Sequence, residues 1–264
     1  MAIRLLAVDI DGTLTNQTHT VSDANTEAIR AARQAGVFVT LATGRGHLAS
    51  REILRAIDVS GPSIHYGGAW IIEEPGGATL YFTPLTPEVV SETLALAKEL
   101  RVIAQLYQEN IVLVEKANPF TQRYVQKFNL PMRIEPHICN KKMCDVPKIL
   151  ILTAPEDEER ILTICSDRLG EQAEITRSQL GFIEINRLGV NKASGLAFVA
   201  DMLGIQQEET AAIGDSFLDA DMLQWAGEGV CVDNAAEAVK QWADVIVPSC
   251  DDDGVAYYIR QYLL

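Results

Sequence analysis

Long apolar runs, a basic charge excess and a secretion signal are all missing from this sequence of 264 residues. The longest apolar stretches, such as 5–8 and 149–152, have the length of a strand, far short of the roughly 20 apolar residues that span a bilayer. The first ten residues lack a basic segment, a long apolar segment and a small-residue cleavage site. We therefore expect neither a transmembrane helix nor a cleaved signal peptide.

The charge and the cysteines exclude further classes of protein. A net charge of −14 disfavours binding to nucleic acid or to an anionic membrane surface, which need a basic patch. It also disfavours an anionic substrate, unless a divalent cation sits among clustered carboxylates. Five scattered cysteines, an odd number in a long chain, favour a reducing, cytoplasmic setting, and their spacing matches no zinc pattern.

What the sequence does contain is an alternation of strand and helix patterns. With 48% hydrophobic residues it has enough apolar material for two domains. The patterns predict strands at 3–8, 37–41 and 210–213, and helices at 22–36, 47–57 and 191–203. Pro75-Gly76-Gly77 predicts a hairpin turn, and a helix is expected at 88–100 within a second region that reaches about Ile185. The interrupted alternation predicts a parallel sheet with an inserted domain.

Polar side chains follow the ends of the predicted strands. Asp9 and Asp11 follow the first strand, Thr43 the second and Asp215 the late one. Ligands of doubly wound sheets bind outside the carboxyl ends of the strands. These distant residues are therefore expected to form one site.

Asp9-x-Asp11 is the most informative pair. Two carboxylates leaving a buried strand are costly without a cation or a proton between them, and Gly12 permits a sharp turn. A carboxylate nucleophile with a second carboxylate near the leaving oxygen is sufficient for covalent phosphoryl transfer. The alternatives are an acidic surface turn or a calcium loop, although Leu14 and Thr15 do not continue the oxygen ligands of such a loop.

The segment Asp9-Ile10-Asp11-Gly12-Thr13-Leu14 resembles the first motif of the haloacid dehalogenase (HAD) superfamily. The other motifs of its Cof-type phosphatases (subfamily IIB) follow in order: Ala42-Thr43-Gly44-Arg45, then Lys192, then Gly214-Asp215 with Asp219, and a closing segment at 252–256. The resemblance implies an α/β fold with a doubly wound parallel-sheet (Rossmann-like) core and an inserted α+β cap domain. The catalytic core would occupy 1–82 and 189–264, and the cap 83–188.

The resemblance also implies residue roles. Asp9 would be the nucleophile that forms an aspartyl-phosphate, with Mg²⁺ between its carboxylate and the phosphate. Asp11 would be the general acid and base, and its main-chain carbonyl would bind the metal. Asp215 would complete the metal shell and Asp219 would hold metal-bound water. The alternative for Asp219 is a helix cap.

Phosphate contacts are implied for the second and third motifs. Thr43 and the amide of Gly44 would bind phosphate oxygens, and Lys192 would neutralise the transition state. Without the pattern, Thr43 reads as a satisfied strand-end hydroxyl and Lys192 as a solvated lysine. However, a lysine at a helix N-terminus opposes the helix dipole, which favours a neighbouring anion. Arg45 is a substrate-binding candidate that equally suits a pair with a structural carboxylate.

Two departures from the family pattern stand out. Leu218 occupies a position that usually carries Asn, and Gly67-Gly68-Ala69 stands where the family often has Asn-Gly-Ala. Each removes one polar side chain that would support the site. Both changes are expected to affect rate or substrate choice, because no named catalytic group is lost.

We therefore predict a Mg²⁺-dependent phosphatase that acts on a small phosphate ester, with no nucleic acid or membrane partner. The alternatives are a phosphomutase of the same superfamily, a phosphoacceptor signalling module and a non-catalytic phosphate-binding protein. The substrate, whether sugar phosphate, nucleotide or phosphorylated cofactor, and the oligomeric state are not readable from the sequence.

Overall fold

The computed structural model describes residues 2–264, which divide into two compact units. The first unit comprises the chain up to Arg45, Ser50–Tyr81 and Asn191–Leu264. The second comprises Gly46–Ala49 and Phe82–Val190. None of the helices formed by residues 2–264 combines the length and the apolar character needed to cross a bilayer.

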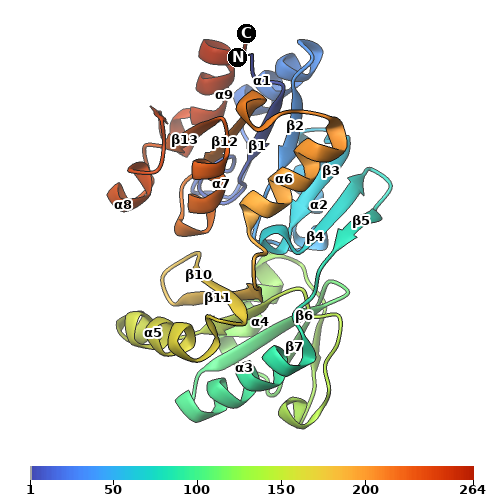
Figure 1. Cartoon of the computed structure of the whole chain (residues 1–264), viewed down its shortest axis with the longest axis vertical. Helices are drawn as coiled ribbons and strands as arrows, with labels where there is room; N and C mark the ends of the chain where they lie inside the picture. The colour runs from blue at the N-terminus through green and yellow to red at the C-terminus, as the bar shows by residue number, and fades with distance from the viewer. Residues whose placement is uncertain (1) are drawn as a thin grey trace. The chain divides into compact units, whose positions relative to one another are not determined.

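A parallel sheet of five strands organises the first unit, in the order β14-β13-β12-β1-β2. In Figure 1 the blue strand β1 lies between β2 and the orange β12, so the two ends of the chain share one sheet. The strands are β1 (Leu5–Val8), β2 (Phe38–Leu41), β12 (Thr210–Gly214), β13 (Glu228–Val232) and β14 (Val245–Val247). A single parallel bridge between Ala42 and Ile64 leads to a second, three-stranded sheet of β3 (Gly61–His65), β4 (Trp70–Glu74) and β5 (Ala78–Phe82).

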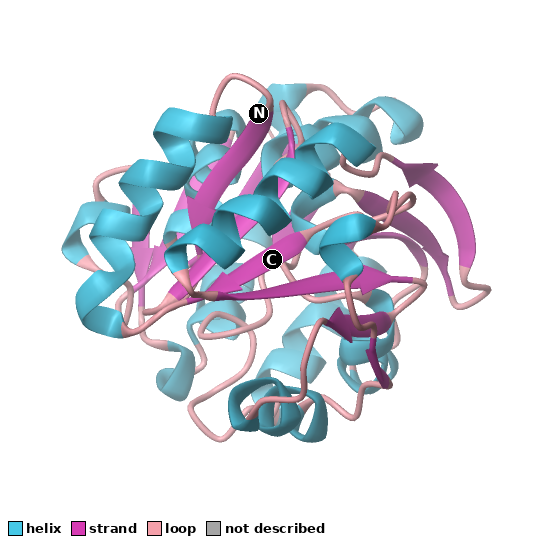
Figure 2. Ribbon diagram, turned by 90° about the horizontal axis from the view of Figure 1, so that it is seen from below, coloured by secondary structure: helices cyan, strands magenta, loops and turns pink. Residues whose placement is uncertain are grey.

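Helices cover both faces of the parallel sheet, because successive side chains of a strand point to opposite faces. Leu6 and Val8 pack in one apolar cluster, whereas Leu5 and Ala7 pack in another. The first cluster receives α1 (Asp23–Gln34), α2 (His47–Ala56) and α9 (Gly254–Tyr258), and the second receives α6 (Lys192–Leu203), α7 (Ala220–Trp225) and α8 (Glu237–Lys240). Figure 2 shows these cyan helices running alongside the magenta strands.

The second unit contains a mixed sheet of six strands, in the order β10-β11-β9-β6-β7-β8. All its strand pairs are antiparallel except β7 with β8. Its helices α3 and α5 pack with the sheet around a separate apolar core. Its elements are α3 (Pro87–Leu100), β6 (Ile103–Gln108), β7 (Ile111–Val114), α4 (Pro119–Lys127), β8 (Met132–Ile134), β9 (Ile149–Leu152), α5 (Glu158–Leu169), β10 (Ala173–Arg177) and β11 (Phe182–Arg187).

The predicted fold class is confirmed: a doubly wound parallel sheet is interrupted by an α+β insertion. The local signals acted as expected. The Ser22 side chain caps α1 by accepting from the Asn25 amide, and β4 and β5 flank the turn at Pro75-Gly76-Gly77. Strands β1 and β2 begin one or two residues later than predicted, at Leu5 and Phe38. The apolar residues before each strand extend the sequence pattern beyond the hydrogen-bonded part of the strand.

Candidate active site

The site lies at the carboxyl ends of the central strands β1, β12 and β2. Val8, the last residue of β1, pairs with Ile213 on one side and with Leu41 on the other. Asp9 follows immediately, and its amide donates to the carbonyl of Ile213 over 3.0 Å. From β1 the sheet continues to β2 in one direction and to β12 in the other, which is the switch point where such folds bind ligands.

The turn after Asp9 is shaped to receive Asp215. Gly12 has a φ of +78°, and a Cβ at this residue would lie 2.5 Å from Oδ2 of Asp215. The hydroxyl of Thr13 donates to Oδ1 of the same carboxylate over 3.0 Å. Glycine is therefore required here both for the positive φ and for the close approach of Asp215.

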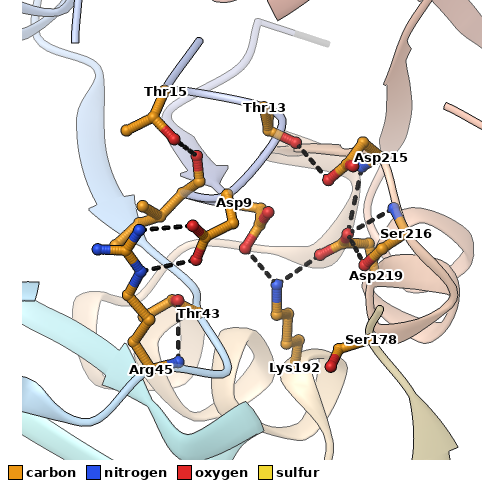
Figure 3. Close-up of polar contacts among 12 residues, drawn as sticks. Asp9, Thr13, Thr15, Thr43, Arg45, Ser178, Lys192, Asp215, Ser216 and Asp219 are labelled. Carbon is orange, nitrogen blue, oxygen red and sulfur yellow. Dashed lines mark hydrogen bonds and ion pairs between the residues drawn. The ribbon is translucent and has the colours of Figure 1, made fainter. Parts of the chain in front are cut away.

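Lys192 is the cation at the centre of the site. It is the first residue of α6, whose N-cap Asn191 accepts from the Ser194 amide in a reciprocal capping box. Its side chain is 1% exposed, and Nζ donates to Oδ1 of Asp9 and Oδ1 of Asp219, each over 2.6 Å. Figure 3 shows the amine between these two carboxylates. Lys192 is thus paired with buried acids and is not a solvated lysine.

Gly68 keeps the glycine of the family's Asn-Gly-Ala segment and lies against the start of α6. It has a φ of +106°, and a Cβ would lie 2.1 Å from the carbonyl oxygen of Asn191. This backbone packs directly against the N-cap of the helix that begins with Lys192. A side chain at Gly68 would displace that helix end.

Asp219 is fully buried and closes the loop after β12. Its Oδ2 accepts from the amides of Asp215 and Ser216 and from the Ser216 hydroxyl, over 2.7–3.2 Å. It occupies the N-cap position of α7, but its side chain makes no capping hydrogen bond to that helix. The Asp219 side chain does cap the 3₁₀ turn Phe217–Asp219 that leads into α7, in a reciprocal capping box with Ser216. Asp219 therefore has part of the cap role that the sequence offered as an alternative, and its other oxygen also holds Lys192.

Three carboxylates of the site are close enough to hold one metal ion. One ligand oxygen from each of Asp9, Asp215 and Asp219 lies within 4.8 Å of the other two. Carboxylate oxygens are the hard ligands that Mg²⁺ prefers. With Lys192, the group carries a formal charge of −2 when ionised, which a divalent cation balances. The residues present fit a magnesium ion.

The electrostatics of the site show the same unbalanced negative charge. Burial raises the pKa of Asp9 to about 7, opposed by the nearby ammonium of Lys192 and reinforced by Asp219. Burial, Asp9 and Asp219 together raise the pKa of Asp215 well above its usual range. Burial alone lowers the pKa of Lys192, but the carboxylates of Asp219 and Asp9 outweigh it and the pKa is raised overall. Lys192 is therefore charged, and the carboxylates lack a full counter-charge.

Asp11 lies outside this carboxylate group and pairs with Arg45. The guanidinium donates from Nε to Oδ2 of Asp11 over 2.6 Å and from Nη2 to Oδ1 over 2.5 Å, which forms a two-pronged contact. Arg45 is buried, whereas a quarter of the Asp11 side chain is exposed. His19 lies 3.9 Å from the same carboxylate. Arg45 thus holds the orientation of Asp11.

Thr43 and Gly44 form the turn between β2 and Arg45. Thr43 is 1% exposed, its amide donates to the carbonyl of Ile64, and its hydroxyl oxygen accepts from the Arg45 amide over 3.1 Å. Gly44 is half-buried beside it. The Thr43 hydroxyl oxygen is therefore a satisfied acceptor at the strand end, as in the alternative interpretation of this residue.

Sequence reasoning missed several residues that support the site: Thr13, which binds Asp215, Ser216, which binds Asp219, and Asn234, whose amide donates to the Gly12 carbonyl. Thr13 and Ser216 adjoin the motifs, so a hydroxyl next to each acidic residue was the available signal. No local pattern marked Asn234, because its partner lies 222 residues away.

Comparisons with known proteins agree with this geometry. A family described as haloacid dehalogenase-like hydrolase matches residues 6–259. The 5-amino-6-(5-phospho-D-ribitylamino)uracil phosphatase YcsE of Bacillus subtilis is 32% identical over 262 residues, which cover 99% of this chain and 96% of that protein. A crystal structure of a haloacid dehalogenase-like hydrolase from Bacteroides thetaiotaomicron is 29% identical with a TM-score of 0.85, over 98% of this chain and 99% of the other.

A solved sugar phosphatase of HAD subclass IIB has a TM-score of 0.86 at 25% identity, over 98% of each chain. The family match covers all the motif residues that meet in the first unit. The resemblance inferred from the sequence is therefore confirmed. The chain belongs to the haloacid dehalogenase-like hydrolases.

Proposed function

We propose that this protein is a Mg²⁺-dependent phosphatase that hydrolyses small phosphorylated metabolites through an aspartyl-phosphate on Asp9. The observation that carries the proposal is the arrangement around Asp9. Asp9 is 5% exposed, and its carboxylate is held by the Lys192 ammonium beside Asp215 and Asp219. A buried carboxylate in a fixed orientation, next to a cation and at the switch point of the sheet, is suited to attack an electrophile that carries negative charge.

In the first step an Asp9 oxygen attacks phosphorus, and the bond between phosphorus and the ester oxygen breaks. Lys192 offsets the negative charge of the transferring group, while the Thr43 hydroxyl and the Gly44 amide donate to its oxygens. These groups already stand at the strand ends and require no rearrangement of the sheet. Such preorganised donors lower the barrier because they are oriented before the reaction begins.

Asp11 moves the proton in both steps. It protonates the leaving alkoxide, and then as a carboxylate it removes a proton from the water that attacks phosphorus and breaks the bond to Asp9. The two-pronged contact from Arg45 fixes the direction of the Asp11 carboxylate during both proton transfers. Because a quarter of the Asp11 side chain is exposed, a substrate oxygen and then a water can reach it.

We assign the metal site to the carboxylates of Asp9 and Asp215 and the main-chain carbonyl of Asp11, with Asp219 behind them. When bound, Mg²⁺ supplies charge neutralisation for the nucleophile and the phosphate. Thr13 and the Gly12 backbone hold Asp215 in place, and Lys192 and Ser216 hold Asp219. The site therefore has supporting contacts for each acidic residue.

The second unit, 83–188 in the predicted division, is proposed as the cap that selects the leaving group. The relatives named above, one a phosphatase of a phosphoribityl compound and one a sugar phosphatase, support a polyhydroxylated phosphate ester as the substrate class. We also propose that the protein acts in the cytoplasm. Its five cysteines are all free thiols in the described structure, which suits a reducing compartment.

The test is phosphate release from para-nitrophenyl phosphate and a panel of sugar and nucleotide phosphates, with Mg²⁺ and with EDTA, by wild type and by Asp9→Asn. We expect release that requires Mg²⁺ and is lost in Asp9→Asn, because the amide is not a nucleophile. An Asp9→Asn variant that is pure, folded and still active would contradict covalent catalysis at Asp9. Release by wild type in EDTA would contradict the metal dependence.

A further inference from the structure

Asn234 connects three distant segments of the first unit. It follows β13, the neighbour of β12 in the parallel sheet. Its Nδ2 donates to the carbonyl of Gly12 over 2.8 Å, and its Oδ1 accepts from the amide of Cys250 over 2.8 Å. One side chain thus ties the turn after Asp9 to the C-terminal segment of the chain.

The carbonyl that Asn234 holds belongs to the residue that packs against Asp215. The Gly12 Cα is so close to Asp215 that a Cβ would lie 2.5 Å from Oδ2 and 3.0 Å from Cγ. The next residue, Thr13, binds the other oxygen of that carboxylate. A rotation of the Gly12 peptide would therefore shift both contacts that orient Asp215.

We propose that Asn234 is a positioning residue for the cation site, acting through Gly12 on Asp215. Asn234 itself contacts neither Asp9 nor Asp215 in its two side-chain hydrogen bonds. The inference rests on the proposed Mg²⁺ dependence and deepens it. Hydrogen-bonded groups behind metal ligands typically contribute about 10–100-fold to metal affinity. Because Asn234 acts through one further residue, we expect the lower end, about tenfold.

Asn25 provides a matched control within the same unit. Its Nδ2 donates to the carbonyl of Leu14 over 3.2 Å, and its Oδ1 accepts from the amide of Ala256 over 2.9 Å. It too joins the segment after β1 to the C-terminal segment. It is more buried than Asn234, at 1% exposed, so its loss is expected to destabilise the fold more. Leu14, however, makes no contact with Asp215 comparable to those of Gly12 and Thr13.

The experiment measures Mg²⁺ binding directly, by titration calorimetry and by the Mg²⁺-induced rise in the thermal unfolding midpoint, without substrate. Asn234→Ala is expected to bind Mg²⁺ about tenfold more weakly than wild type, and Asn25→Ala within about twofold of wild type. Asn234→Asp retains an acceptor for Cys250 but has no donor for Gly12. It is also expected to bind more weakly, although its added negative charge acts in the opposite direction.

Circular dichroism establishes that each variant is folded, and the exposed position of Asn234 favours this outcome. Wild-type affinity in both Asn234 variants would overturn the positioning role and leave the proposed phosphatase intact. Equal losses in Asn234→Ala and Asn25→Ala would overturn it as well, since the effect would be general destabilisation. A wild type that binds no Mg²⁺ would overturn the proposed metal dependence and this inference together.

Discussion

Replacement of Lys192 by methionine tests the electrostatic account of the site. Methionine has a similar length and fills the same buried volume, but it removes the charge that joins Asp9 to Asp219 through two hydrogen bonds of 2.6 Å. The formal charge of the ionised group then changes from −2 to −3. Without a metal, the buried carboxylates lose the cation that stabilises them.

The size of the effect follows from the burial of the pair. Removing one partner of a buried ion pair costs about 3–5 kcal/mol, because the remaining charge is uncompensated. At about 2–4 °C per kcal/mol for a chain of this size, the unfolding midpoint in EDTA is expected to fall by about 10 °C. Turnover is expected to fall about 10²–10³-fold in saturating Mg²⁺, which is the usual cost of one donor to the transition state.

The assay is thermal unfolding followed by circular dichroism at pH 8, in EDTA and in Mg²⁺, with kcat measured in parallel. Lys240→Met is the matched control. Lys240 also bridges two carboxylates, those of Asp233 and Glu237 at 2.9 and 3.0 Å, but both acids are largely exposed. Ion pairs with solvent-exposed acids contribute little to stability, so this midpoint should move by no more than about 4 °C.

Two results would contradict the proposed role of the Lys192 charge. If Lys192→Met and Lys240→Met had the same midpoint in EDTA, Lys192 would not be stabilising the buried acids. If Lys192→Met retained kcat within about threefold of wild type, its ammonium would not act on the transferring phosphoryl group, whatever its effect on stability.

Three further outcomes are expected. Gly12→Ala places a Cβ 2.5 Å from Oδ2 of Asp215 at a φ of +78°, so we expect a loss of about 1–3 kcal/mol in stability and weaker Mg²⁺ binding. Mg²⁺ binding like that of wild type, measured by calorimetry, would contradict the tight fit of this turn. Arg45→Lys replaces the two-pronged contact to Asp11 by a single ammonium. The kcat for alkyl phosphates should therefore fall by more than the kcat for para-nitrophenyl phosphate, because the nitrophenolate leaving group needs little protonation. Equal losses would argue against a role of Arg45 in proton transfer. Burial raises the pKa of Cys165 to about 11, so at pH 8 only about one thiol in a thousand is ionised. Iodoacetamide should therefore modify the exposed Cys144 first, and the rate of Cys165 modification should rise from pH 8 to pH 10. Equal rates at pH 8, measured by mass spectrometry, would contradict the burial of Cys165.

Local patterns in the sequence predicted much of the framework, because they depend on neighbours along the chain. Ser22 ahead of an apolar helix stripe and Gly36 after it delimit α1, and the apolar run before Asp9 marks a buried strand. The carboxyl-end rule for parallel strands then placed Asp9, Thr43 and Asp215 at one edge of the sheet. The order of the motifs pointed to the family.

Which charged side chains form pairs depends on the packing of elements that are distant in the sequence. Lys192 and Asp219 are 27 residues apart and Lys192 and Asp9 are 183 apart, and only the packing of α6 onto η1 (Tyr66–Gly68) and the sheet brings the amine between both acids. Arg45 suited either a substrate or a carboxylate in the sequence, and the fold pairs it with Asp11.

The same holds for Asn234, which has no distinguishing neighbours and whose contact with Gly12 exists only because β13 lies next to β12 and β12 next to β1. The elements, their order and the candidate acids follow from local features of the sequence, since these are set by local periodicity and turn chemistry. The pairing of those acids with their cations and donors was decided by the three-dimensional packing, because electrostatic and hydrogen-bond partners are chosen by distance in space.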